Sequence, residues 1–161
     1  MSRFTAPVRR KGDSFQIDLG RDETSLVLRL IGELRALLTD PQPTADAQVL
    51  LVRLFPVAHP DDEQLEAEYQ GWMRTELVQS KLAAIAIVED ALEGDGCVDE
   101  GRLMAFMQAL NSLRLVLGTL IGVTDDPVID EVAPGYVDST EYALYSYLSW
   151  LLEHCVGVLA P

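Results

Sequence analysis

The chain has 161 residues, of which 48% are apolar and 24% are charged, and its formal net charge is −14. This length and composition indicate one soluble globular domain with a hydrophobic core and exclude an intrinsically disordered chain. The net charge argues against autonomous nucleic-acid binding, because non-specific affinity for DNA comes from cationic contacts to phosphates. We also expect no signal peptide and no contact with a membrane, and therefore a cytoplasmic protein.

The first predicted element is an antiparallel β-hairpin over residues 3–19. Two alternating runs, at residues 4–8 and 14–19, are separated by Arg10, Lys11, Gly12 and Asp13, which suit a turn. Two strands alone are only marginally stable, so we expect the hairpin to pack against helices. Its cationic side chains are interpreted as a strand edge that discourages aggregation.

Five helices are predicted after the hairpin, because apolar residues recur at three- and four-residue spacing and acidic or hydroxyl residues stand at the helix starts. They cover residues 22–39, 46–55, 61–93, 99–122 and 139–160. The segment of residues 124–137, which contains several acidic residues, is predicted to form a long loop. The sequence therefore predicts one mainly α-helical domain over residues 1–161, a five-helix orthogonal bundle with a small N-terminal β-hairpin.

The longest predicted helix, residues 61–93, changes its apolar side along its length. Its N-terminal half is predicted to bury Leu65, Tyr69, Trp72 and Met73, whereas its C-terminal half turns a different side inward. We therefore expect the two halves to pack against different neighbours.

The helix over residues 99–122 is apolar on nearly all sides and is predicted to lie at the centre of the bundle. Its non-apolar residues Asn111, Arg114 and Gly118 share one face, at i, i+3 and i+7. A buried arginine needs a partner, since an unpaired interior charge costs several kcal/mol. Two interpretations stay open: an internal polar clamp in which Gly118 admits a neighbouring backbone, or a pocket in which Asn111 and Arg114 hold an anionic ligand.

The helix over residues 139–160 has apolar residues on more than one side. One stripe is predicted to face the central helix. A second stripe consists of Tyr145, Leu152, Val156 and Leu159. We expect this stripe to form a homodimer interface; the alternative is that the hairpin and the first helix cover it.

No motif for catalysis or for binding a cofactor or a metal is recognised. The two histidines, His59 and His154, lack the Glu-x-x-His spacing of di-iron bundles. We therefore expect no enzymatic activity, no cofactor and no metal. Cys97 lies among acidic residues that oppose a reactive thiolate, and Cys155 stands at a core position, so we do not expect a redox switch between them.

Four segments carry a resemblance to a known family: residues 15–38, residues 54–62, residues 110–118 and residues 142–159. The most specific is the Asn-x-x-Arg-x-x-x-Gly pattern of the central helix. Together they resemble an actinobacterial domain-of-unknown-function family whose genes typically lie beside the gene for the ClpS protease adaptor. One branch, the AosR type, comprises oxidative-stress transcriptional regulators that act with other transcription proteins.

The resemblance implies a regulator rather than an enzyme, with a protein partner in the transcription or proteolysis machinery. An acidic surface suits basic partners. We therefore expect a non-enzymatic acidic regulatory protein that acts through protein–protein interaction in transcription or the stress response. The alternative is a small-molecule binding protein that holds an anionic ligand with Asn111 and Arg114.

Overall fold

The computed structural model describes residues 6–122 and 139–160. The predicted fold class is confirmed: within these residues the chain forms five helices and a small N-terminal hairpin. The predicted loop of residues 124–137 lies outside the described residues. The elements in chain order are β1 (Val8–Lys11), β2 (Ser14–Ile17), α1 (Arg21–Thr39), α2 (Ala45–Val52), α3 (Glu63–Glu93), β3 (Cys97–Val98), α4 (Glu100–Leu120) and α5 (Thr140–Leu159).

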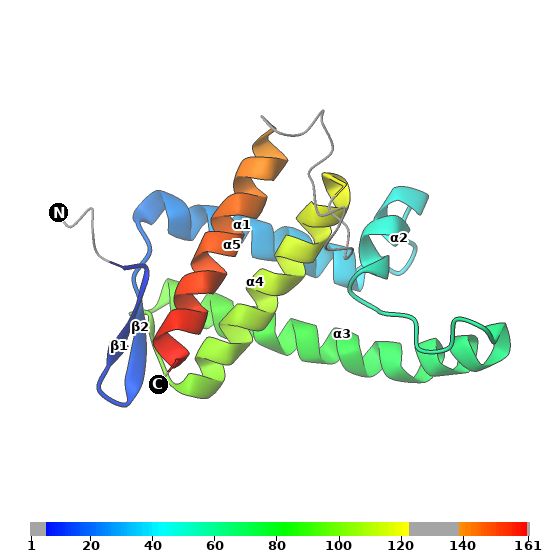
Figure 1. The fold of residues 1–161 in the computed structure, drawn as a ribbon, viewed down its shortest axis with the longest axis horizontal. Coiled ribbons are helices and arrows are strands. Elements are labelled where there is room, and N and C mark those ends of the chain that lie inside the picture. The colour runs from blue at the N-terminus through cyan, green and yellow to red at the C-terminus, as the bar shows by residue number, and fades with distance from the viewer. Residues whose placement is uncertain (1–5, 123–138, 161) are drawn as a thin grey trace.

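Helix α4 is the centre of the fold. It runs antiparallel to α5, and this pair crosses α1 and α3 at a steep angle (Figure 1). Leu103, Phe106 and Leu110 on α4 are fully buried, as are Leu148 and Leu151 on α5. By length and hydropathy α4 is also able to cross a membrane. Its place between α3 and α5 accounts for that apolar character, because a core helix buries apolar residues on several sides.

The first strand of the hairpin extends further toward the turn than the sequence predicts. Residues 3–5 lie outside the described part, and the first strand, predicted over residues 4–8, is instead β1 at Val8–Lys11. The register runs from Val8 opposite Ile17 to Lys11 opposite Ser14. The predicted strand position was wrong because Arg10 and Lys11 were assigned to the turn, whereas an edge strand tolerates cationic side chains that point to water.

A third strand, which the sequence did not predict, joins the hairpin to the bundle. The two residues of β3 pair antiparallel with Phe15 and Gln16 of β2. Gly96 brings the residue before β3 close to the end of β2. Its φ is +78°, and its carbonyl accepts a hydrogen bond from the backbone N of Ile17 at 2.8 Å. A Cβ at position 96 would lie 2.2 Å from the carbonyl oxygen of Ile17. Only glycine fits there without displacing the strand.

The N-terminal hairpin is also fixed to the last helix. Arg10 Nη2 donates a hydrogen bond to the carbonyl of Val158, near the end of α5, at 3.0 Å. The same guanidinium lies 4.9 Å from the centre of the Phe15 ring. Basic side chains near a helix C-terminus are stabilising, because they interact favourably with the unpaired backbone carbonyls there. The cationic hairpin therefore holds the end of α5 as well as forming a strand edge.

The two halves of α3 have different environments. Its buried residues, Ala84, Ile85 and Val88, all lie in the C-terminal half. The N-terminal part, residues 63–76, extends past α4 and α5 (Figure 1), and we call it the α3 arm. The predicted burial of Leu65 and Trp72 is wrong, since they are 45% and 74% exposed. Tyr69 and Met73 are only half-buried. The apolar face of the arm therefore leaves Leu65 and Trp72 exposed among the described residues.

Candidate functional site

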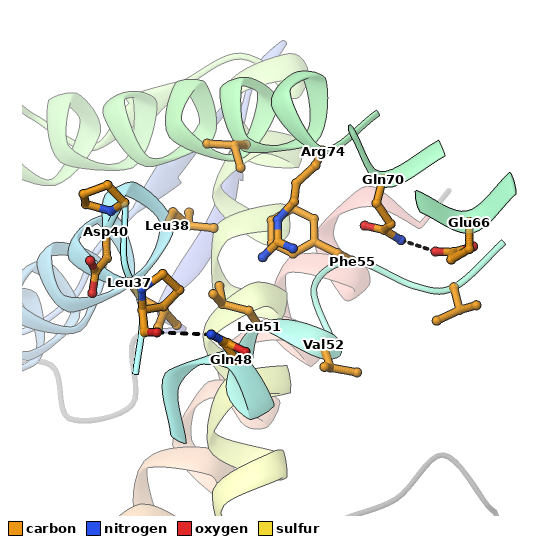
Figure 2. A pocket seen from close by; sticks show the side chains of 14 residues that line it. Leu37, Leu38, Asp40, Gln48, Leu51, Val52, Phe55, Glu66, Gln70 and Arg74 are labelled. Carbon is orange, nitrogen blue, oxygen red and sulfur yellow. Dashed lines mark hydrogen bonds between the residues drawn. The ribbon is translucent and has the colours of Figure 1, made fainter. Parts of the chain in front are cut away.

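A cavity of about 540 Å³ lies between the C-terminal end of α1, helix α2 and the α3 arm (Figure 2). Its size is within the range of small-molecule sites, and its wall combines apolar side chains with a few polar ones. The polar residues are Asp40, Gln48, Glu66, Gln70 and Arg74, and the apolar ones include Leu37, Leu38, Leu51, Val52, Phe55, Val57 and Val78.

Glu66 uses its carboxylate to hold the loop that precedes the arm. Oε1 accepts hydrogen bonds from the backbone N of Ala58 at 2.9 Å and of His59 at 2.7 Å. Oε2 accepts one from Gln70 Nε2 at 2.5 Å, and the same amide reaches the carbonyl of Pro56 at 3.3 Å. The hydrogen bond from Gln70, followed by that from His59, lowers the pKa of Glu66. These polar atoms of the cavity therefore serve to fix the loop to the arm.

Arg74 lies over the ring of Phe55, with its guanidinium carbon 4.5 Å from the ring centre (Figure 2). It forms no ion pair with any residue of the described ranges 6–122 and 139–160, although Asp40 and Glu66 line the same cavity. The cation–π contact, worth about 0.5–1 kcal/mol at an exposed site, connects the arm to the segment after α2.

The exposed side of the arm carries a different set of residues. Leu65, Tyr69 and Trp72 fall at i, i+4 and i+7, so they share one face of α3; we call these three residues the arm face. None of them lines the cavity. The Tyr69 ring makes an edge-on contact with His59 at 5.8 Å. Residues 61–76 include six acidic residues and one basic residue. The arm is thus an acidic helix with an apolar face on which Leu65 and Trp72 are exposed and Tyr69 is half-buried.

A second hollow lies between α4 and α5, with a volume of about 660 Å³. It brings together residues that the sequence analysis had placed in two separate stripes. We call it the α4/α5 groove, and it is lined by Gly101, Met104, Ala105, Met107, Gln108, Asn111, Arg114, Leu152, Val156 and Leu159. Met104 is 58% exposed and Val156 is 56% exposed. The apolar floor of the groove is therefore open to water.

Of the predicted polar stripe, only Asn111 and Arg114 reach this groove. Gly118 is buried and absent from its lining. Arg114 is half-buried, and its guanidinium carbon lies 5.6 Å from the centre of the Tyr145 ring. In the part of the chain that the structure describes, no carboxylate pairs with Arg114. Tyr145 is itself half-buried and stands outside the groove lining.

A polar contact between α3 and α4 involves Lys81 and Ser112, which are not part of the predicted clamp. Lys81 Nζ on α3 lies 3.4 Å from the hydroxyl oxygen of Ser112 on α4. Ser112 is buried, and burial lowers the pKa of Lys81. Ser112 could not be recognised in the sequence, because a small hydroxyl residue inside an apolar helix gives no periodic signal. The contact lies at the α3–α4 interface and borders neither hollow.

Both cysteines are free thiols. Cys97 is exposed on β3, whereas Cys155 is fully buried in α5, and burial raises its pKa to about 12. Among the described residues, no group of three or more His, Cys, Asp or Glu side chains is placed to hold a metal ion.

Comparison with known proteins gives one family and no individual relative. No curated protein and no solved structure matches the chain. The family model described as "Domain of unknown function (DUF2017)" matches residues 1–159. This match includes the whole α3 arm and the residues of the α4/α5 groove. The chain therefore belongs to the domain-of-unknown-function family DUF2017.

Proposed function

We propose that this chain is a non-enzymatic regulatory protein that binds another protein through the α3 arm. The observation that carries the proposal is the exposure of the arm face, in which Trp72 is 74% and Leu65 is 45% exposed. Tryptophan and tyrosine often dominate binding energy at protein interfaces. Anchors at i, i+4 and i+7 are those with which an amphipathic helix fills an apolar groove on its partner.

The charge of the arm defines the chemistry of the partner. Glu68 and Glu76 are exposed on the same helix as Trp72, and residues 61–76 are strongly acidic. A complementary surface has an apolar groove for the arm face and a rim of lysine or arginine side chains. Such complementarity speeds association and disfavours wrong partners more than it adds affinity. We therefore expect binding to weaken as salt concentration rises.

The cellular role follows from the resemblance noted in the sequence. Relatives of the AosR type, and genes beside the ClpS adaptor in actinobacteria, favour a cytoplasmic partner in transcription or the stress response, with the proteolysis machinery as the other source.

Site-specific photo-cross-linking in cells tests the proposal. A photo-reactive amino acid replaces Glu68, which lies one helical turn from Trp72, and in a second strain it replaces Gly32, an exposed position on α1 with open space around it. We expect position 68, and not position 32, to yield one defined cross-linked protein with a basic, apolar groove. Its identification as a transcription, stress-response or proteolysis protein is part of the expected result.

Trp72→Ala supplies the decisive variant, with Trp150→Ala as its matched control. Trp150 is 43% exposed but lies on α5, away from the arm. Removing a hot-spot tryptophan costs roughly 2 kcal/mol or more of binding free energy, so Trp72→Ala should weaken the affinity for the purified partner at least tenfold. Trp150→Ala should leave it unchanged. If Trp72→Ala binds normally, or if position 32 captures the same protein, the arm is not the binding surface.

A further inference from the structure

We infer that the α4/α5 groove is occupied by a second copy of this chain, paired about a twofold axis that passes through Met107. This inference is independent of the α3 arm, because neither Leu65 nor Trp72 lines the groove. It concerns a surface whose residues are contributed by α4 and α5.

The spacing along α4 is that of a helix-pairing seam. Glu100, Met104, Met107, Asn111 and Arg114 recur at alternating intervals of four and three residues. This is the repeat with which one helix presents a continuous stripe to another. All of them except Glu100 line the groove, and Glu100 is the exposed first residue of the same helix. The stripe is therefore acidic at one end, methionine-rich in the middle and cationic at the other end.

The two charges are placed symmetrically about the middle of the stripe. Glu100 and Arg114 each lie seven residues from Met107, so they are about 21 Å apart at a rise of about 1.5 Å per residue. When two copies of α4 run antiparallel about Met107, each Glu100 faces the Arg114 of the other copy. This pairing gives Arg114 the carboxylate that it lacks among the described residues of its own chain.

The same arrangement covers the apolar part of the groove. Met104 and Val156 are more than half exposed in one copy, beside Leu152 and Leu159. A twofold contact is made by the same patch on both chains, so it removes these side chains from water twice. Methionine at the axis suits a self-contact, because its flexible side chain adapts to an identical neighbour.

A small anionic ligand explains less of this surface. It would pair with Arg114 and Asn111, but it would leave Met104 and Val156 exposed to water. The second copy accounts for the whole stripe, including its acidic end.

Charge reversal tests both the dimer and its register. By sedimentation at micromolar concentration we expect a dimer for the native chain, and at least tenfold weaker dimerisation for Glu100→Arg and for Arg114→Glu, in each of which two like-charged pairs form. An equimolar mixture of these two variants should form a heterodimer, since every facing pair is again of opposite charge. Glu68→Arg, with the same charge change on the α3 arm, should dimerise normally.

Met104→Glu and Val156→Glu change side chains that are more than half exposed. We expect both variants to be monomeric with a native circular-dichroism spectrum. A native chain that sediments as a monomer at micromolar concentration overturns the inference. A native dimer whose two charge-reversed variants, Glu100→Arg and Arg114→Glu, form no heterodimer with each other overturns the register through Met107. A monomer that is stabilised against heat by decanoate, but not after Arg114→Leu, shows that an anionic ligand occupies the groove instead. Cross-linking through position 68 should be unaffected in the groove variants. The dimer inference and the proposed binding through the α3 arm can therefore be refuted independently of each other.

Discussion

Arg35 and Glu89 form the bidentate ion pair that joins α1 to α3. Arg35 Nη1 donates to Glu89 Oε2 at 2.8 Å, and Nη2 donates to Oε1. The hydrogen bonds from Arg35 lower the pKa of Glu89, more than desolvation raises it. The side chains remain 39% and 28% exposed, so solvent screens the attraction. The pair fixes the relative position of two helices more than it adds stability.

Glu89→Gln should lower the free energy of unfolding at neutral pH by roughly 0.5–1 kcal/mol. Because the pKa of Glu89 is lowered from its ordinary value of 4.5, the stabilisation is fully present above about pH 4.5 and is lost as pH falls through the lowered pKa. Urea unfolding at a series of pH values measures this difference. Glu33→Gln, at an exposed carboxylate on α1, is the control. A difference that stays constant into acid would show that the charge on Glu89 is not its source.

The two thiols should differ sharply in reactivity. Burial raises the pKa of Cys155 to about 12 and hides its sulfur in the core, whereas Cys97 is exposed. Only a thiolate reacts with iodoacetamide. We expect the native protein to be alkylated at Cys97 alone and at both positions in urea, as peptide mass spectrometry will show. After peroxide treatment no Cys97–Cys155 disulfide should appear; its detection would establish the redox switch that we do not expect.

Helix α3 joins two environments in one continuous element. Its C-terminal half is buried against the bundle, and its arm is held by Glu66, by Gln70 and by Arg74 over Phe55. Local opening is easiest where few apolar contacts are lost. The arm therefore has lower local stability than the rest of the same helix.

Amide hydrogen exchange should reveal this gradient. Backbone amides of residues 66–76 should exchange faster than those of residues 84–92, although all of them belong to one helix. Peptide-resolved mass spectrometry measures both segments in a single sample. Glu66→Ala should further speed exchange at Ala58 and His59, whose amides Glu66 binds, and Glu68→Ala serves as the control. Equal protection along the whole helix would contradict the lower stability of the arm.

Gly96→Ala should be among the most damaging small substitutions. The added Cβ would stand 2.2 Å from the Ile17 carbonyl oxygen at a backbone φ of +78°. Such strain costs about 1–3 kcal/mol before any displacement of β2 is counted. Gly32→Ala is the matched control, because it lies in α1 with open space and should be neutral or stabilising. Thermal unfolding compares the Gly96→Ala and Gly32→Ala variants. A Gly96→Ala protein as stable as the native chain would refute the close contact between residue 96 and the Ile17 carbonyl.

The helices could be predicted from the sequence because each carries its own apolar periodicity and its own start signals. The first strand was misplaced, and β3 was missed, because two residues have no periodicity and β3 exists only through its pairing with β2. The α3 arm was predicted to be buried because periodicity reports an apolar face and not whether a neighbour covers it. The stripes on α4 and α5 that contribute to the groove could both be recognised in the sequence. That they lie side by side could not be predicted, because it depends on how α4 packs on α5.

At the scale of the whole molecule, a net charge of −14 favours expansion through self-repulsion. Raising NaCl from about 10 mM to about 150 mM shortens the screening length from about 30 Å to about 8 Å. We expect the melting temperature to rise over this range, as measured by circular dichroism. A fall would mean that favourable pairs such as Arg35–Glu89 and Arg9–Asp18, the latter at 3.3 Å, outweigh the overall repulsion.

The contact between Arg10 and Val158 spans 148 residues, and this has a consequence for synthesis on the ribosome. The hairpin and α4 are complete before α5, the helix that covers one side of α4, has emerged. During that interval the nascent chain displays a helix whose length and hydropathy are those of a membrane segment. We expect chaperones or targeting factors to compete for α4 until α5 has emerged and packed on it.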